Sequence, residues 1–240
     1  MRRLHERVAG FLFPTRAVCL GCGDPAGMEE EWLCPRCRAR LKPGVHRLQS
    51  DEWPRDGISR EWFAMFYEDP VARLVRQFKY GGVYRLAPFL AECLRPLLSA
   101  LNPADYDCLV AVPLHEKRRL ERGFNQSDIL AGLISERTGI RLENAVRRTK
   151  NTNQQARLST DARKKNVLGA FECTASLEGK RVLLIDDVFT TGSTVNSCAQ
   201  ALRAGGARDV QALTVAASHH YRHREIMIYR KKPPGHASKP

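Results

Sequence analysis

The sequence predicts an α/β fold in which helices flank a parallel sheet. The chain has 240 residues, enough for one sizeable core and a small appendage. Short, continuously apolar segments such as 108–112 and 182–185 alternate with segments whose apolar residues recur at helical spacing. Strands without polar alternation are buried on both faces, which is typical of parallel sheets covered by helices.

The strands are expected where short apolar runs end at turn residues or charges. Pro113 ends one run, because proline cannot donate a hydrogen bond to a sheet, and a pair of aspartates follows another. The expected strands are 62–67, 108–112, 145–149, 181–185 and 210–216.

The helices are expected where apolar residues are three or four positions apart. Pro88 suits the first turn of a helix, and Gly139 and Gly205 follow the last residues of two others. The expected helices are 71–79, 86–101, 125–137, 161–167 and 193–204.

Composition divides the chain into four parts. Residues 1–48 contain a cysteine cluster and little periodicity, and the polar residues 49–60, with a proline and a glycine, are expected to be a linker. The α/β domain is expected over 61–218. Residues 219–240 are basic and end in a Pro/Gly/Ser-rich stretch, so we expect a disordered tail.

The charge of the chain indicates a polyanionic partner. Lys and Arg number 39 against 26 Asp and Glu, a net charge of +13, which favours nucleic acid, phosphorylated metabolites or an acidic membrane surface. The apolar run at 8–13 is too short for a signal peptide and ends at Pro14. No segment approaches the roughly 18–20 apolar residues that span a bilayer. We therefore expect a soluble, cytoplasmic protein.

The stretch VLLIDDVFTTGST at 182–194 places two carboxylates, Asp186 and Asp187, at the end of a buried strand. Ligands of open α/β sheets bind beyond the carboxyl ends of the strands. The next residues combine hydroxyl side chains, a glycine and a helix N-terminus, which together can hold a phosphate. They are Thr190, Thr191, Gly192, Ser193 and Thr194. Because carboxylates can bind sugar hydroxyls or the waters of Mg²⁺, the stretch predicts a ribose 5-phosphate site.

This stretch resembles the phosphoribosyl-pyrophosphate (PRPP) motif of type I phosphoribosyltransferases, with Phe189 slightly unusual at its place. The segments LVRQFKYG (74–81), AVPLHEKRRLERGFNQS (111–127) and RRTKNTNQQARLSTDARKKNVLGAF (147–171) extend the resemblance. Together with the N-terminal cysteines, they are similar to the ComF family of competence-associated proteins from about residue 1 to 217. The resemblance implies a type I phosphoribosyltransferase-like sheet with a small N-terminal zinc-binding segment, and PRPP with Mg²⁺ as its ligand.

The resemblance also implies a pyrophosphate-binding loop after the strand at 108–112. Its residues are Leu114, His115, Glu116 and Lys117, and Arg122 is expected to add positive charge. A solvated basic turn is the alternative interpretation, and Asn125 could simply cap the helix that follows.

A second basic segment is expected to act as a flap. Residues 141–165 hold eight Lys and Arg and two acids. Gln155, Arg157, Arg163 and Asn166 match the family pattern, and in related enzymes a flexible segment here closes over the substrate, which would exclude water. The same segment could instead contact a nucleic-acid backbone. In LVRQFKYG, we expect Phe78 to be core, whereas Tyr80 could be core or stack on a base.

The N-terminal cysteines predict a structural zinc site. Cys19, Cys22, Cys34 and Cys37 form two C-x2-C pairs, and zinc takes four such ligands in a tetrahedron. A redox role is the competing interpretation, which two pairs so close together disfavour. The segment is too small to bury a core, so the metal would stabilise its fold. The other four cysteines are expected to be buried as small apolar residues.

Three functions are compatible with these features. The first is a ComF-type, PRPP-binding protein with a phosphoribosyltransferase fold that assists DNA uptake or natural transformation, with competence helicases or recombination proteins as partners. The second is a module for binding single-stranded DNA in which PRPP acts as a regulator. The third is a nucleobase salvage enzyme, which we rank last because no base-specificity loop is recognisable. The sequence identifies no general base and no acceptor nucleophile.

Overall fold

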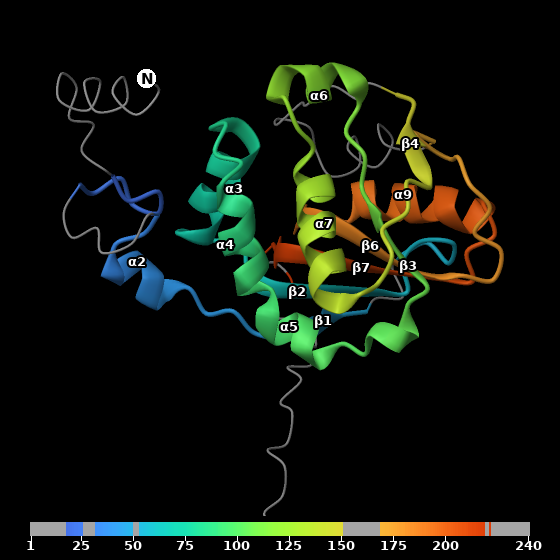
Figure 1. Cartoon of the computed structure of the whole chain (residues 1–240), viewed down its shortest axis with the longest axis horizontal. Helices are drawn as coiled ribbons and strands as arrows, with labels where there is room; N and C mark the ends of the chain where they lie inside the picture. The colour runs from blue at the N-terminus through green and yellow to red at the C-terminus, as the bar shows by residue number, and fades with distance from the viewer. Residues whose placement is uncertain (1–17, 26–31, 50–52, 151–168, 219–220, 222–240) are drawn as a thin grey trace, which may run out of the picture.

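The computed structural model describes residues 18–25, 32–49, 53–150, 169–218 and 221 (Figure 1). The expected helix at 161–167 and most of the expected tail at 219–240 therefore lie outside the described residues. Within the described residues, no helix combines the length and the apolar character that crossing a membrane requires.

A five-stranded sheet in the order β1-β2-β7-β6-β3 forms the centre of the molecule. The four strands β2, β7, β6 and β3 are parallel, and the edge strand β1 is antiparallel to β2. Their bounds are His46–Leu48 (β1), Arg60–Phe66 (β2), Cys108–Ala111 (β3), Arg181–Phe189 (β6) and Asp209–Ala217 (β7). The predicted α/β fold is thus confirmed, with β1 as an unpredicted addition.

Helices cover both faces of this sheet (Figure 1). Leu183 and Ile185 of β6 pack in one core cluster with helices α3, α4 and α7, whereas Val182 and Leu184 pack on the other face with α9. This division follows from the strand itself, because successive side chains point to opposite faces. The helices are Val71–Tyr80 (α3), Leu86–Cys93 (α4), Gln126–Thr138 (α7) and Ser193–Ala204 (α9).

The single helix expected at 86–101 is broken in two. Helix α4 ends at Cys93, and α5 spans Arg95–Ala100 with Pro96 in its first turn. A proline inside a continuous helix would clash with the carbonyl group four residues earlier and would remove a hydrogen bond, so the chain starts a new helix there.

A second, two-stranded antiparallel sheet accounts for the strand expected at 145–149. Its strands are β4 (Val146–Arg148) and β5 (Phe171–Cys173), and β5 was not predicted. Both strands lie beside α9 rather than in the central sheet (Figure 1).

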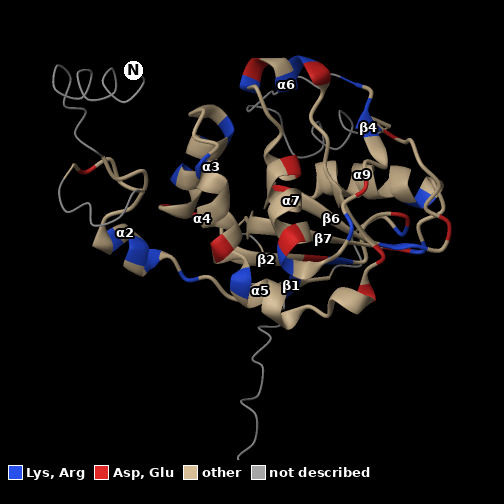
Figure 2. Ribbon diagram, viewed as in Figure 1, with Lys and Arg blue, Asp and Glu red and all other residues tan. Residues whose placement is uncertain are grey.

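The N-terminal cysteine segment packs against the start of α3. It contains helix α2 (Pro35–Arg40), which carries several basic residues (Figure 2). A Cβ atom added to Gly21 would lie 2.9 Å from Cβ of Pro70, so glycine permits this close approach. Arg40 also donates a hydrogen bond of 2.9 Å to the carbonyl oxygen of Asp69.

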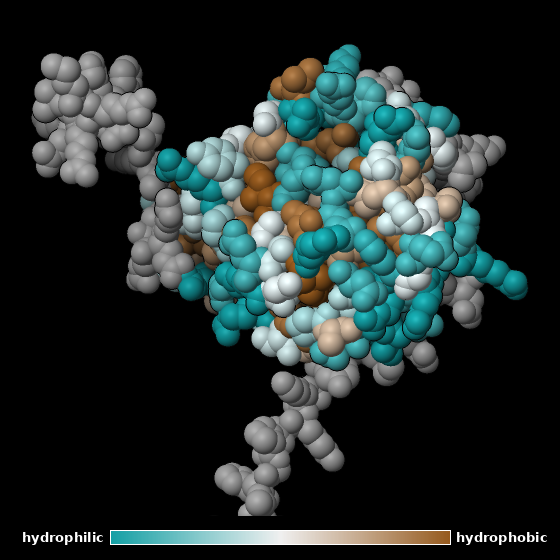
Figure 3. Space-filling model, turned by 45° about the vertical axis from the view of Figure 1, so that its right-hand side comes forward, coloured by the Kyte–Doolittle hydropathy of each residue, from teal (hydrophilic) through white to brown (hydrophobic). Residues whose placement is uncertain are grey.

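The described part of the segment 49–60 packs on the sheet domain. Ile58 is buried, and its backbone N–H donates to Oδ1 of Asn196 on α9 at 3.1 Å. On the face that Figure 3 shows, hydrophobic residues reach the surface in small groups between hydrophilic ones.

Candidate functional site

Two adjacent carboxylates lie near the carboxyl end of strand β6. Asp186 accepts a hydrogen bond of 2.9 Å from the hydroxyl of Ser127 on α7 and another of 2.9 Å from the N–H of Asp187. Both bonds go to Oδ1 of Asp186, which fixes the orientation of this carboxylate.

The second carboxylate forms a buried ion pair that the sequence did not predict. Nζ of Lys79, in the last turn of α3, lies 2.8 Å from Oδ1 of Asp187, and the Asp187 side chain is 6% exposed. Burial lowers the pKa of Lys79, but the charges of Asp187 and Asp186 outweigh it, and the pKa is raised overall. Lys79 therefore carries its full positive charge at neutral pH.

The surroundings of Asp186 disfavour the ionised form of its carboxyl group. Burial and the neighbouring charge of Asp187 raise the pKa of Asp186 to about 6, against the smaller opposing effects of Lys79 and Ser127. A strongly perturbed carboxylate at the carboxyl edge of a parallel sheet is typical of a ligand-binding site. A cation or a pair of hydroxyl donors would compensate the unfavourable charge.

Three consecutive residues at the start of α7 connect the parts of this site. The side chain of Asn125 caps α7, and its Nδ2 donates to the carbonyl oxygen of Val112, just after β3. Gln126 donates through Nε2 to the carbonyl oxygen of Lys79 at 3.3 Å, and Ser127 holds Asp186. Asn125 was predicted as a cap; the structure shows that the same turn also positions two other chain segments.

The hydroxyl-rich loop after β6 forms the N-terminal end of α9. Gly192 has a φ of +74°, and a Cβ there would lie 2.6 Å from the Phe189 ring, so only glycine fits without strain. The hydroxyls of Thr191 and Ser193 are 2.8 Å apart, and Ser193 and Thr194 occupy the first turn of α9, whereas Thr190 is exposed. Hydroxyls at a helix N-terminus favour an anion such as phosphate.

The predicted pyrophosphate loop divides between a loop and a helix. Leu114 precedes helix α6 (Glu116–Arg122), and His115 caps it by accepting a hydrogen bond of 3.2 Å from the N–H of Lys117. Glu116 and Lys117 therefore lie in the first turn of a helix, which carries charges of both signs (Figure 2).

Two arginines lie in the region of the acids: Arg122, which was expected to add positive charge there, and Arg148, which the sequence analysis did not single out. The guanidinium of Arg122 stacks at 4.7 Å from the centroid of Tyr80, which is 55% exposed, and Nη1 donates to Gln126. Arg148 of β4 lies over the Phe171 ring. Burial and the charge of Arg118 lower the pKa of Arg148, and Asp186 opposes them, so these charges gather in one region. Phe78 is buried, as expected.

The predicted flap residues cannot be placed. Gln155, Arg157, Arg163 and Asn166 lie outside the described residues.

A buried acid lies behind the pair. Glu61 of β2 is fully buried, and its Oε1 lies 2.6 Å from the hydroxyl of Thr214, the residue that pairs with Asp186 across β6 and β7. Its Oε2 has no hydrogen-bond partner among the described residues. Burial raises the pKa of Glu61 well above its ordinary value, and the charge of Asp186 adds to this effect. No motif in the sequence marked Glu61, because its environment comes from strands distant in the chain.

The four N-terminal cysteines converge as predicted. The sulfur atoms of Cys19, Cys22, Cys34 and Cys37 all lie within 4.8 Å of one another. Those of Cys22 and Cys34 are 3.8 Å apart, close to the separation of about 3.8 Å that a tetrahedron with Zn–S bonds of about 2.3 Å requires. Burial raises the pKa of the Cys19 thiol, but N–H groups of Cys34, Cys22 and Gly21 outweigh it and lower the pKa to about 6. These cysteines can hold a metal ion.

The remaining cysteines largely follow expectation. Cys93, Cys108 and Cys198 are buried, whereas Cys173 is only half-buried.

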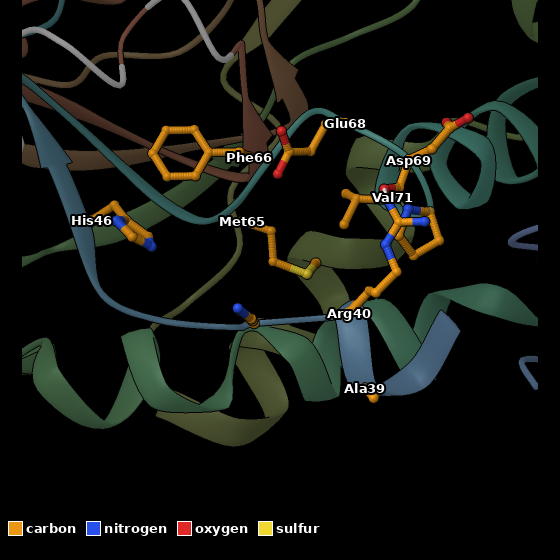
Figure 4. A pocket seen from close by; sticks show the side chains of 10 residues that line it. Ala39, Arg40, His46, Met65, Phe66, Glu68, Asp69 and Val71 are labelled. Carbon is orange, nitrogen blue, oxygen red and sulfur yellow. Dashed lines mark hydrogen bonds between the residues drawn. The ribbon is translucent and has the colours of Figure 1, made fainter. Parts of the chain in front are cut away.

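A cavity of about 550 Å³, which neither Asp186 nor Asp187 lines, lies between the cysteine segment and the connection from β2 to α3 (Figure 4). Arg40 and Glu68 place opposite charges on its wall, and Met65, Phe66 and His46 line it as well. None of the predicted site residues lines this cavity.

Comparisons with known proteins identify the domain and the relatives of this chain. The family model described as "Phosphoribosyl transferase domain" matches residues 125–232. The DNA utilization protein YhgH of Escherichia coli (strain K12) is 33% identical over 203 residues, covering 82% of each chain. Competence protein F of Haemophilus influenzae is 34% identical over 203 residues, which cover 81% of this chain and 83% of that protein.

More distant matches are found as well. Competence protein ComFC of Bacillus subtilis is 28% identical over 223 residues, covering 88% of this chain and 89% of that one. Among solved structures, orotate phosphoribosyltransferase from Aeropyrum pernix is 18% identical, with a TM-score of 0.35, and covers 72% of this chain and 76% of that one. On the strength of the relatives that are at least one-third identical over most of their length, the chain belongs to the ComF family of competence-associated proteins with a phosphoribosyltransferase domain.

Proposed function

We propose that this protein binds PRPP with Mg²⁺ and assists the uptake or use of DNA in the cytoplasm. Its relatives carry the names DNA utilization protein and competence protein. The observation that carries PRPP binding is the acid pair at the end of β6, one residue of which has a pKa raised to about 6, directly before the hydroxyl loop of α9.

The ribose and the 5-phosphate of PRPP match the acid pair and the hydroxyl loop at this edge of the sheet. Asp186 and Asp187 would accept hydrogen bonds from the two ribose hydroxyls, and Thr190 to Thr194 would hold the 5-phosphate at the N-terminus of α9. Leu114 to Lys117, with Arg122, would meet the pyrophosphate. The flap residues Gln155, Arg157, Arg163 and Asn166, which lie outside the described residues, would close over the bound PRPP.

Two metal ions belong to this proposal. Carboxylates and phosphates are the ligands that Mg²⁺ prefers, and Mg²⁺ bound with PRPP would offset the charge of pyrophosphate. Zinc fits the four-sulfur cluster of the N-terminal segment and would stabilise its fold, because this segment has little apolar core of its own.

Calorimetric titration of PRPP with Mg²⁺ tests the proposal. Wild-type protein should bind, and the double variant Asp186→Asn/Asp187→Asn should lose binding by at least about a hundredfold, because two charge-assisted hydrogen bonds are lost. A circular-dichroism spectrum checks that the variant folds. Failure of the folded wild type to bind PRPP would refute this function.

Single-stranded DNA is the second polyanion that we propose as a partner. The net charge of +13 and the arginines gathered near the acid pair favour it. A helicase or recombination protein that acts on incoming DNA would be the matching protein partner. DNA affinity should fall steeply with salt and should survive the Asp186→Asn/Asp187→Asn change, whereas affinity lost with the acids would place DNA and PRPP in one site.

A further inference from the structure

Lys79, like the predicted pyrophosphate loop, lies outside the matched phosphoribosyl transferase domain. That domain begins at residue 125, whereas Lys79 lies on α3, within the segment LVRQFKYG. Its ammonium group reaches across to Asp187 at 2.8 Å, and the Lys79 side chain is 24% exposed. The pair is therefore shielded from water but still open to a ligand at the edge of the sheet.

The charge balance of the edge explains why a lysine is needed here. Asp186 and Asp187 are adjacent carboxylates in a site proposed to receive a polyanion, and like charges repel strongly where water is scarce. One cation inside the site reduces this repulsion before a ligand or a metal arrives. Lys79 is that cation, since it contacts Asp187 and its charge also acts on Asp186.

The contacts of the α3 end place Lys79 beside the predicted pyrophosphate loop. Gln126 binds the carbonyl oxygen of Lys79, and Asn125 in the same turn binds that of Val112, two residues before the loop begins at Leu114. The neighbour of Lys79, Tyr80, stacks with Arg122 of α6, the helix in which this loop ends. The 5-phosphate loop, by contrast, leads into α9, which packs on the opposite face of the sheet.

We propose that Lys79 is a substrate-binding residue that contacts the pyrophosphate end of PRPP while it neutralises Asp187. This inference rests on the proposed function and extends it to a residue outside the matched domain. The ammonium group has three N–H donors, of which the contact with Asp187 uses one, so it can bridge a carboxylate and a phosphate oxygen.

The alternative is an ion pair that only stabilises the fold, and the chain offers a matched control for it. Nζ of Lys180 lies 3.0 Å from Oε2 of Glu143, and the two side chains are 30% and 13% exposed, much like those of Lys79 and Asp187. Lys180 immediately precedes β6, at the other end of the strand from the acid pair. Lys180→Met therefore removes a similar lysine–carboxylate contact at the other end of the strand, where Arg141 continues to pair with Glu143.

The experiment measures binding of PRPP, pyrophosphate and ribose 5-phosphate, each with Mg²⁺, to wild type, Lys79→Met and Lys180→Met. Lys79→Met should weaken PRPP and pyrophosphate by about ten- to a hundredfold, the effect of losing one charge-assisted hydrogen bond, and should change ribose 5-phosphate by less than about threefold. Lys180→Met should leave all three affinities unchanged.

Other results would overturn the inference. A folded Lys79→Met protein that binds pyrophosphate like wild type would make Lys79 a structural residue, as would equal losses for pyrophosphate and ribose 5-phosphate. If wild type binds no PRPP, the proposed function itself fails, which is a distinct result.

A second comparison covers the case in which Lys79→Met does not fold. The double variant Lys79→Met/Asp187→Asn removes both members of the ion pair, so neither is left without the other, and it is compared with Asp187→Asn alone. The inference requires a further loss of pyrophosphate affinity in the double variant, and equal affinities in the two proteins would refute it.

Discussion

The two ends of the parallel sheet treat carboxylates in opposite ways. At the amino ends of the strands, Asp107 and Asp209 each meet an arginine, and both have a lowered pKa. At the carboxyl ends, Asp186 has a raised pKa. Under the proposed function, the amino edge is stable by itself, whereas the carboxyl edge would be completed by a bound ligand.

The amino edge is satisfied internally. The carboxylate of Asp107 accepts hydrogen bonds from the side chain and the backbone N–H of Arg181, which lower the pKa of Asp107 to about 2. Asp209 likewise pairs with Arg203 at 3.1 Å. These acids are therefore anions at every physiological pH and need no ligand.

At the carboxyl edge, the protein's own groups compensate the charges of the carboxylates only in part. Lys79 compensates Asp187, whereas the hydrogen bonds that Asp186 accepts from the described residues come from neutral groups, and Glu61 is fully buried behind it. Groups whose charge is unfavourable in the unliganded protein are those that a bound cation or hydroxyl donor stabilises most. Under the proposed function, this edge is less stable without its ligand than with it.

Asp186→Asn should therefore have the largest effect, with opposite consequences for ligand binding and for stability. The variant should lose PRPP affinity but gain about 1–2 kcal/mol in free energy of unfolding at pH 7, because the raised pKa makes ionised Asp186 destabilising. Asparagine can still accept the hydrogen bond from Ser127. Chemical unfolding with and without ligand measures both effects.

The pH dependence of that gain follows from the sign of the shift. The pKa of Asp186 is about 6 in the folded protein against an ordinary 3.8, so wild type loses stability as the pH rises from about 4 to 6. The advantage of Asp186→Asn should thus be absent below pH 4 and complete above pH 6. A variant less stable than wild type at pH 7 would break the comparison.

Glu61→Gln should sharpen the comparison with a smaller gain in stability. Because the pKa of Glu61 is raised, wild type pays a free-energy penalty that grows as the pH rises above the ordinary value of 4.5. Glutamine can donate one N–H to the Thr214 hydroxyl, because that hydroxyl can itself donate to the carbonyl oxygen of Ala216, 3.2 Å away. The second N–H of the glutamine stays buried, which offsets part of the gain in stability.

Two measurements check this variant. Thermal unfolding at pH 5 and pH 8 should show a larger advantage at pH 8. Difference infrared spectroscopy should show that a protonated carboxylic acid band of wild type disappears in Glu61→Gln. A variant that is destabilised equally at both pH values would indicate that Glu61 is ionised in the native protein.

Asp107→Asn should give the smallest effect, with the opposite sign. The same chemical change removes an acid whose pKa is lowered, so stability should fall at pH 7. The loss should disappear as the pH drops through the range from 3.8 to about 2, where wild-type Asp107 also becomes protonated. Because the pair is at the surface, its effect should also shrink in high salt. PRPP affinity should not change, and a change would show that the two edges are coupled.

Much of this fold could be predicted from local sequence. The run VLLI followed by two acids and a hydroxyl loop has one good solution, a buried strand whose ligand-binding end leads into a helix, and the structure shows β6 and α9 there. The four cysteines likewise converge because their spacing brings two short turns together. Such features depend on residues a few positions apart.

Other features were decided by contacts between distant segments. Lys79 and Asp187 are 108 positions apart, by subtraction of their numbers, and the tertiary structure brings them to 2.8 Å, with the end of α3 held against the start of α7 by Gln126. Glu61, 153 positions from Thr214, looks like an ordinary polar residue until β2 pairs with β7. The sequence by itself determined most of the central strands, several of the helices and the chemistry of the acid pair, because these follow from local periodicity and side-chain type. Only the tertiary structure decided which charges are compensated, since burial and charge pairing depend on neighbours that the linear order does not reveal.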